Sequence, residues 1–235
     1  MYDNYRQDFE KYAKKHQIKY IAALFDQIPR QLGQKFKFSS IPGEFRKRDL
    51  LPCFELLAKA GVIHLVYHTS AQGFPLGADL NFDKLKVLFL DIGMAQALLG
   101  LDLKEWMLNP LNAFINQGAI VEAFVGQEIL AYSHAFFKKN IYYWQNETAS
   151  GQAEVDYIVQ IKNTIIPIEA KSGKTGTLKS LKEFLKKHPE TLYSIRFSGH
   201  NYSVYDHLHS YPLYAIAKAI KEDWFNKVTF NYDPE

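Results

Sequence analysis

The chain has 235 residues, of which 47% are hydrophobic and 23% are charged, and its formal net charge is +3. These values exclude a disordered or low-complexity chain, and the length suits one large domain or two small ones. The small net charge gives no argument of its own for nucleic-acid binding. The single cysteine, Cys53, excludes an internal disulfide framework and a cysteine-based zinc site, and it favours a reducing compartment.

The ends and apolar stretches of the chain argue against secretion and membrane insertion. The N-terminus, MYDNYRQDFEKYAKKHQ, is polar and charged, unlike a signal peptide. The most apolar stretches, 85–101 and 111–133, each contain two acidic or basic residues, which argues against a membrane span. We therefore expect a cytoplasmic protein with no membrane partner.

The first half of the chain is predicted to contain two helices and a two-stranded ribbon. Apolar residues recur at helical spacing in two segments that end at Gly33 and Gly61, and Pro52 falls in the first turn of the second helix, where proline is tolerated. The predicted elements are helices over 17–32 and 48–60, then strands over 62–69 and 86–91 joined by a loop over 70–82. This order fits a winged-helix unit. Arg46, Lys47 and Arg48, just before the second helix, either meet phosphates or form a solvated surface.

The second half begins with a long apolar helix over 112–137 that carries an unexpected carboxylate. Apolar residues occur on nearly every side of it, which is typical of a buried helix. Gly118, Glu122 and Gly126 follow an i, i+4, i+8 pattern and share a strip on which the glycines would let another backbone come close. A carboxylate there requires a cation, a metal or hydrogen-bond donors. Glu128 is a competing candidate, and either residue also fits a salt-bridged helix position.

A three-stranded meander is predicted to follow, over 141–145, 153–161 and 165–171. Alternation along the second strand places Val155, Tyr157 and Val159 on one face and Glu154, Asp156 and Ile158 on the other. Along the third strand it separates Ile166, Ile168 and Ala170 from Glu169 and Lys171. If the charged faces align, Asp156, Glu169 and Lys171 converge.

Such a convergence predicts a metal site. Two carboxylates are hard oxygen ligands of the kind that Mg²⁺ or Mn²⁺ prefers, and a lysine beside them can orient a metal-bound water or neutralise developing charge. This chemistry hydrolyses phosphodiesters. The same spacing also fits a solvated hairpin in which Lys171 pairs with Asp156 across the strands.

Four other patterns are weaker. The "SGKT" at 172–175 lacks the first glycine of a phosphate-binding loop, because position 168 is isoleucine, and we find no such loop elsewhere. The two histidines of "HLH", at 207 and 209, have no nearby third ligand, so surface or strand-end positions are favoured over a zinc site. Aromatic residues at 142–144 indicate core first and base stacking second. A helix over 177–187 is lysine-rich, with Lys174, Lys179, Lys182, Lys186 and Lys187 in or before it.

The order of these motifs resembles a known family. A helix glutamate, a strand aspartate and a following E-x-K resemble the PD-(D/E)xK nuclease superfamily. The segments "FKFSSIPGEFRKRDLLPCFELLAKAGVI", "KVLFLDIGMAQALLG", "GAIVEAFVGQEILAY", "YYWQNETASGQAEVDYIV", "IPIEAKSGKTGTLKSLKEF" and "YPLYAI" resemble, in order, the uncharacterised C-terminal region of prokaryotic AAA-type ATPases. That resemblance implies a winged-helix segment and a PD-(D/E)xK-like fold, both preceded by an ATPase module.

The resemblance also implies roles for individual residues. Asp156 and Glu169 would hold Mg²⁺ or Mn²⁺, Glu122 would support the metal or its water, and Lys171 would position the nucleophile. Weaker nucleic-acid contacts are expected from Arg46, Lys47, Arg48 and Lys174.

We therefore expect an α+β protein with a winged-helix-like domain over 1–105 and a restriction-endonuclease-like domain over 106–235. The expected function is that of a nuclease-like, DNA-binding part of an AAA-type ATPase, without ATP hydrolysis by this chain. The alternatives are a non-catalytic domain that regulates the ATPase and a winged-helix DNA-binding protein. The expected partners are DNA, an ATPase module in a separate or preceding segment, and a second copy of the chain.

Overall fold

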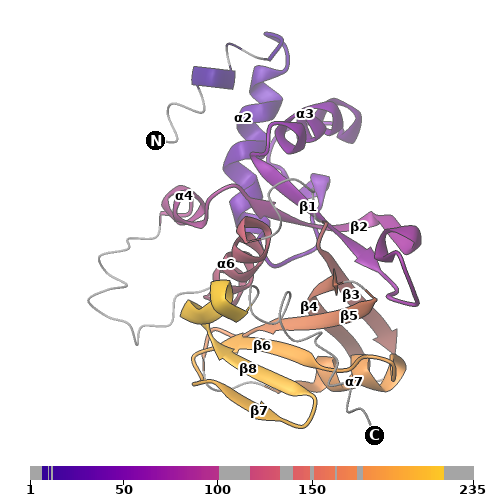
Figure 1. Cartoon of the computed structure of the whole chain (residues 1–235). Helices are drawn as coiled ribbons and strands as arrows, with labels where there is room; N and C mark the ends of the chain where they lie inside the picture. Colours follow the sequence, from indigo (N-terminus) through magenta and orange to yellow (C-terminus); the bar gives the residue numbers. More distant parts are fainter. Residues whose placement is uncertain are drawn as a thin grey trace, which may run out of the picture. The chain divides into compact units, whose positions relative to one another are not determined.

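The protein has an α+β fold, as the sequence predicts, with helices toward the N-terminus and an eight-stranded mixed sheet (Figure 1). The computed structural model describes residues 7–9, 11, 13–100, 117–132, 140–148, 151–161, 163–173 and 177–219. The strands lie in the order β2 (Leu80–Phe89), β1 (Ile63–Thr69), β3 (Tyr142–Thr148), β4 (Gly151–Ile161), β5 (Thr164–Ala170), β6 (Ser194–Ser198), β8 (Leu208–Pro212) and β7 (Ser203–Tyr205). None of the described helices has the length and apolar character needed to cross a membrane.

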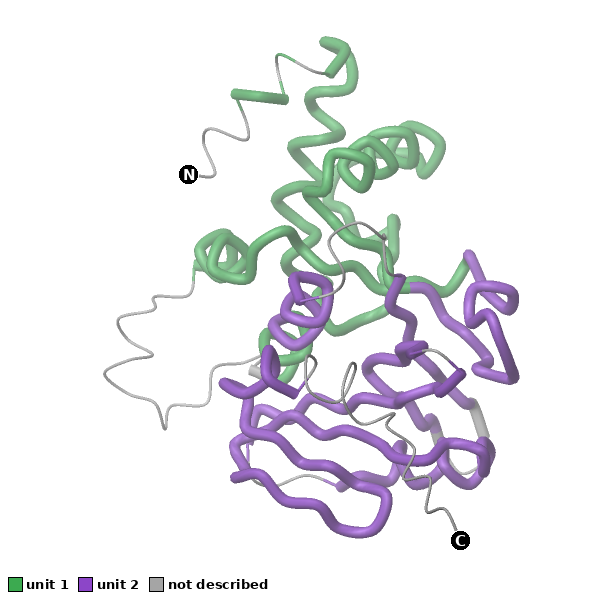
Figure 2. Tube along the Cα trace, viewed as in Figure 1, with its two compact units in different colours: residues 1–66, 83–123 green, residues 67–82, 124–235 purple. Residues whose placement is uncertain are grey.

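The chain divides into two compact units that are not consecutive in sequence (Figure 2). Unit 1 comprises Met1–Val66 and Asp83–Ala123, and unit 2 comprises Tyr67–Phe82 and Phe124–Glu235. The domain boundary expected near residue 105 falls in 101–116, outside the described residues, and stays a prediction.

Unit 1 contains the two helices predicted for the first half of the chain. They are α2 (Ile18–Gln27), extended by a 3₁₀ turn η1 (Ile28–Gln31), and α3 (Lys47–Lys59); α4 (Ile92–Leu98) follows β2. Pro52 lies inside α3 and not in its first turn, because the helix begins one residue earlier than expected. Gly33 and Gly61 have φ angles of 68° and 72°, in the left-handed region that favours glycine after a helix.

Gly33 allows a close approach to helix α6 (Gln117–Ala131). A Cβ atom at Gly33 would lie 2.9 Å from the Cβ and 3.0 Å from the Cα of Ala119. The close approach expected at Gly118 is not seen among the described residues, since none of their atoms would lie within 4 Å of a Cβ there. Gly126 is buried, and every described side chain of α6 from Ala119 to Leu130 is at least partly covered, as predicted for a buried helix.

Unit 2 is built on the predicted meander. Strands β3, β4 and β5 are antiparallel, and helix α7 (Lys179–Lys187) then returns the chain so that β6 pairs with β5 in parallel. One face of the meander packs against Leu181 and Phe184 of α7. The aromatic run of β3 is core, as the sequence favours, with exposed fractions of 7%, 0% and 3% for Tyr142, Tyr143 and Trp144.

The segment between β1 and β2 belongs to the core of unit 2. Ala71 and Leu76 join the same apolar cluster as Trp144. The backbone N–H of Leu76 donates to Oε1 of Gln160, 3.1 Å away. The ring nitrogens of His188 lie 2.9 Å and 3.0 Å from the carbonyl oxygens of Phe184 and Ser70. The tip of the ribbon that the sequence assigns to a winged helix is therefore packed in unit 2.

We expect Gly33→Ala to destabilise the protein by about 2–4 kcal/mol, since it adds the cost of a left-handed alanine to a backbone-level clash with Ala119. Gly61→Ala is the matched control, because its φ is similar but nothing lies within 4 Å of its Cβ; it should cost only about 1 kcal/mol. Urea unfolding measures both. Equal losses for the two variants would show that the contact with α6 contributes nothing.

Candidate functional site

Strand β4 is bulged at the point where the sequence places the first carboxylate. Tyr142 lies opposite Ile158, but Trp144 lies opposite Val155, so β4 has an extra residue between them. Simple alternation puts Val155 and Ile158 on opposite faces, and this prediction is wrong: both lie in the core cluster against α7. A bulge disrupts the local ladder and redirects the side chains of the extra residue. Asp156 is one of the two residues that the bulge redirects.

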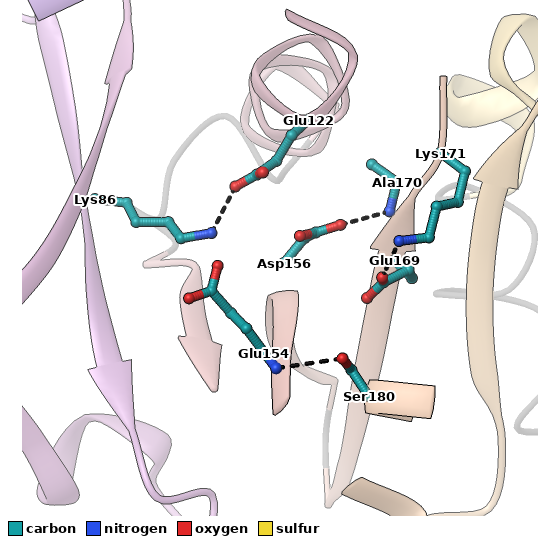
Figure 3. A network of polar contacts seen from close by, with 8 residues as sticks. All are labelled: Lys86, Glu122, Glu154, Asp156, Glu169, Ala170, Lys171 and Ser180. Atoms are coloured by element: carbon teal, nitrogen blue, oxygen red, sulfur yellow. Dashed lines mark hydrogen bonds and ion pairs between the residues drawn. The ribbon is translucent and has the colours of Figure 1, made fainter. Parts of the chain in front are cut away.

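The carboxylate of Asp156 continues the pairing of β4 with β5. Backbone pairing runs from Ile161 opposite Thr164 to Tyr157 opposite Ile168. One residue further, Oδ2 of Asp156 accepts a hydrogen bond of 2.8 Å from the backbone N–H of Ala170 (Figure 3). The side chain thus satisfies a buried donor at the end of the ladder.

Glu169 and Lys171 flank the peptide group that Asp156 holds. The Glu169 side chain is 5% exposed, and its Oε1 lies 2.5 Å from Nζ of Lys171, whose side chain is 29% exposed. The backbone N–H of Lys171 donates to the carbonyl oxygen of Phe197 in β6 at 2.8 Å. The structure therefore brings Asp156, in the middle of β4, together with Glu169 and Lys171 at the end of β5, as the sequence suggests.

The fourth residue of the motif, Glu122, lies in unit 1 and pairs with a lysine that the sequence reading missed. Nζ of Lys86 in β2 lies 2.7 Å from Oε1 of Glu122, and the two side chains are 3% and 13% exposed (Figure 3). This is the cation that the buried carboxylate requires. A lysine inside the apolar run KVLFL was the only sequence signal for it. The support that Glu122 would give to a metal stays a prediction.

Two other glutamates of unit 2, Glu128 and Glu154, have less specific positions than the residues of the motif. The competing candidate Glu128, in the part of α6 that belongs to unit 2, is partly covered, and burial raises the pKa of its carboxyl group above the ordinary value. The backbone N–H of Glu154 donates to Oγ of Ser180 in α7 at 3.3 Å (Figure 3). This bond joins β4 to the first turn of α7.

The carboxylate pair fits a magnesium-type ion only in part. Mg²⁺ usually takes one or two protein carboxylates and keeps several waters, so Asp156 and Glu169 are a suitable donor set. Among the described residues, however, no group of three or more His, Cys, Asp or Glu side chains forms a complete cage. Lys171 also occupies Oε1 of Glu169. A metal would therefore have to displace the ammonium group from that oxygen.

The three basic residues of unit 1 that were expected to contact nucleic acid are exposed. Arg46 caps the N-terminus of α3, and Lys47 and Arg48 begin it; all three side chains are exposed. Nζ of Lys47 lies 5.8 Å from the centre of the Phe38 ring, and Arg48 lies 3.9 Å from Asp49. Lys174 lies outside the described residues.

The two histidines of "HLH" hold structural positions. Nδ1 of His207 lies 2.9 Å from the carbonyl oxygen of Leu192, and the ring of His209 lies 4.9 Å from that of Tyr193. These contacts agree with the strand-end reading that the sequence favours.

We expect Asp156→Asn to unfold like the wild type, within about 1 kcal/mol, because the amide oxygen can still accept from Ala170. Asp156→Ala should lose about 1–3 kcal/mol, since it leaves a buried N–H without its acceptor. Thermal unfolding of the two variants makes the comparison. A strongly destabilised Asp156→Asn would mean that the charge, and not the hydrogen bond, holds the strand ends.

We expect Lys86→Met to cost about 3–5 kcal/mol, because it strands the buried charge of Glu122. The double variant Lys86→Met with Glu122→Leu should recover most of this loss, since neither charge remains. A double-mutant cycle by urea unfolding gives the coupling energy. Strictly additive losses would argue against a direct interaction.

Two family models match the chain, each over less than half of its length. Residues 117–220 match a domain of unknown function (DUF4143) that is known from regions associated with AAA-type ATPases. Residues 1–105 match another domain of unknown function (DUF8612). No curated protein and no solved structure matches the chain. The match of residues 117–220 is thus loosely consistent with a link to AAA-type ATPases, and neither match is a nuclease or winged-helix family.

Proposed function

We propose that unit 2 is a metal-dependent, nuclease-like module of a prokaryotic AAA-type ATPase and that it acts on DNA. One observation carries the proposal: Asp156 accepts a hydrogen bond from Ala170, the residue between Glu169 and Lys171. The three groups of the D…E-x-K motif are thereby fixed around a single peptide unit. The match of 117–220 to a domain known from ATPase-associated regions supports the proposed link to an AAA-type ATPase.

The residues of the site divide the work of phosphodiester hydrolysis between them. Asp156 and Glu169 would hold the divalent ion, and the ion would supply a nucleophilic water at neutral pH and stabilise charge on the phosphoryl oxygen. Asp156 keeps its orientation through the bond from the backbone N–H of Ala170 to Oδ2. Lys171 orients the attacking water or neutralises the developing negative charge.

The ion pair between Glu169 and Lys171 describes the resting state in this proposal. The ammonium group satisfies a carboxylate that is almost fully buried. A bound metal would compete with the ammonium group for Oε1, and the greater exposure of the Lys171 side chain would give it room to turn toward a phosphate. The backbone bond from Lys171 to Phe197 keeps the residue at the site while its side chain moves.

The ATPase link defines the partners. The sequence contains no phosphate-binding loop, so we infer that an AAA-type ATPase module supplies ATP hydrolysis. In this proposal the ATPase module and unit 2 act on the same DNA. The exposed basic residues at the start of α3 are a second, weaker contact to it.

A non-catalytic docking domain is the alternative function, and one observation favours it. Glu169 already has a cationic partner, and structural ion pairs of this kind occur without any activity. In that case the protein regulates or docks the ATPase and binds Mg²⁺ poorly. A third function, sequence-specific DNA binding through a winged helix, would survive the loss of Glu169.

We expect wild-type protein to bind Mn²⁺ in calorimetry and to cleave DNA with Mg²⁺ or Mn²⁺. The double variant Asp156→Asn with Glu169→Gln should lose both, because the two carboxylates are gone while the new amide oxygen at position 156 can still accept from Ala170. Circular dichroism confirms that the variant is folded. No metal binding by the folded wild type would leave the docking function.

Lys171→Met gives a sharper test, because the two functions predict opposite results. If Lys171 competes with the metal for Glu169, its removal should raise Mn²⁺ affinity while abolishing cleavage. If the pair is only structural, the variant should lose stability and gain no metal affinity. Cleavage at the wild-type rate would rule out the catalytic role of this lysine.

A further inference from the structure

A row of lysines on α7 takes no part in the site described above. Lys179, Lys182 and Lys186, here called the α7 lysine row, follow an i, i+3, i+7 pattern and therefore share one side of the helix. All three side chains are exposed. The other side of α7 carries Leu181 and Phe184, which are buried in the core of unit 2. The solvent-facing side of the helix thus presents three positive charges.

No described residue pairs with the lysines of the row. Within the described residues, no hydrogen bond or ion pair engages any of the three ammonium groups. Glu183, the one acidic residue of α7, is half-buried and forms no such pair either. Lys187, also exposed, adds a fourth positive charge beside the row.

The dipole of α7 explains the position of only one of the three lysines in the row. Cations near the C-terminus of a helix are stabilised by its dipole, which accounts for Lys186. Lys179 is the first helical residue, where the dipole opposes a cation, and the first turn contains no acidic residue. Lys182 lies three and four residues from the other two, so like charges are neighbours along the row. An external anion would relieve both conflicts.

The row begins beside a strand of the candidate site. Ser180, which follows Lys179, accepts a hydrogen bond from the backbone N–H of Glu154, two residues before Asp156 (Figure 3). The first turn of α7 is therefore fixed to the strand that carries the first carboxylate. A polymer held by the row would extend from this strand along the helix.

We propose that the α7 lysine row binds the sugar-phosphate backbone of duplex DNA, beside the bond that the site would cleave. This inference rests on the proposed function for the identity of the polymer. The first and last lysines of the row lie seven positions apart, about 10 Å along the helix axis, and one DNA strand carries a phosphate for about every 3.4 Å of the duplex axis. Each ammonium group can neutralise one phosphate, so the row can make up to three such contacts. Contacts of this kind position the duplex without reading its sequence.

The test measures how DNA affinity depends on salt. The full chain is titrated onto a fluorescently labelled 30-base-pair duplex in EDTA, at several KCl concentrations between 50 and 300 mM, and fluorescence anisotropy gives the affinity. The triple variant Lys179→Gln, Lys182→Gln and Lys186→Gln is compared with Lys14→Gln, Lys15→Gln and Lys59→Gln. The control lysines are also exposed and unpaired within the described residues, and the charge change is identical.

The row variant should reduce the slope of log affinity against log salt by about 2–3, since each lost phosphate contact removes about 0.9. At 100 mM KCl its affinity should fall at least about tenfold, while the control keeps the wild-type slope. Equal losses in both triple variants, an unchanged row variant, or a wild-type protein that does not bind DNA would each overturn the proposal. So would a row variant that loses binding to phosphatidylserine vesicles but keeps its binding to DNA.

The same samples separate this inference from the proposed function. Binding is measured without metal, so it does not depend on catalysis. If the row variant loses DNA affinity and the wild type fails to cleave with Mn²⁺, the proposed role of the α7 lysine row in DNA binding is supported and the nuclease assignment fails. If the wild type cleaves and the row variant binds and cleaves equally well, the nuclease assignment stands and the row fails.

Discussion

The hydrogen bond from the backbone of Ala170 to the carboxylate of Asp156 is the interaction on which the candidate site depends. It forms where backbone pairing between β4 and β5 ends, and it follows from the bulge that redirects Asp156. The bond satisfies a buried donor, so the fold alone gives a reason for an acceptor here. Because Ala170 separates Glu169 from Lys171, the same bond sets the geometry of all three charged groups.

In two places among the described residues a buried glutamate pairs with a lysine, but the two lysines differ in their exposure to solvent. The side chains of Lys86 and Glu122 are both almost fully buried. Removing either one would leave the charge of the other buried without its partner. In the second pair Glu169 is equally buried, but Lys171 is 29% exposed. A partly exposed lysine can move its ammonium group into water when another cation takes its place. The second pair is for this reason the one in which metal exchange is chemically reasonable.

The sequence predicted the regular parts of the fold and missed the features that depend on tertiary contacts. Helices α2 and α3 and the meander follow from local periodicity. Alternation also suggested that Asp156 and Glu169 converge, but it misplaced the neighbours of Asp156, and the observed contact depends on the bulge in β4. Local periodicity does not predict the bulge, because one extra residue leaves the composition of a strand unchanged. The pairing of Lys86 with Glu122 joins residues 36 positions apart, and no local pattern specifies it.

Sequence similarity and packing divide this chain differently. The family matches cover 1–105 and 117–220, but residues 67–82 lie within the first match and belong to unit 2. Leu76 fills the core there, and the Ser70 carbonyl contacts the ring of His188. A fragment that contained only residues 117–220 would lack these contacts. The core that supports the carboxylates is therefore encoded by both matched segments, which is why the site has to be studied in the whole chain.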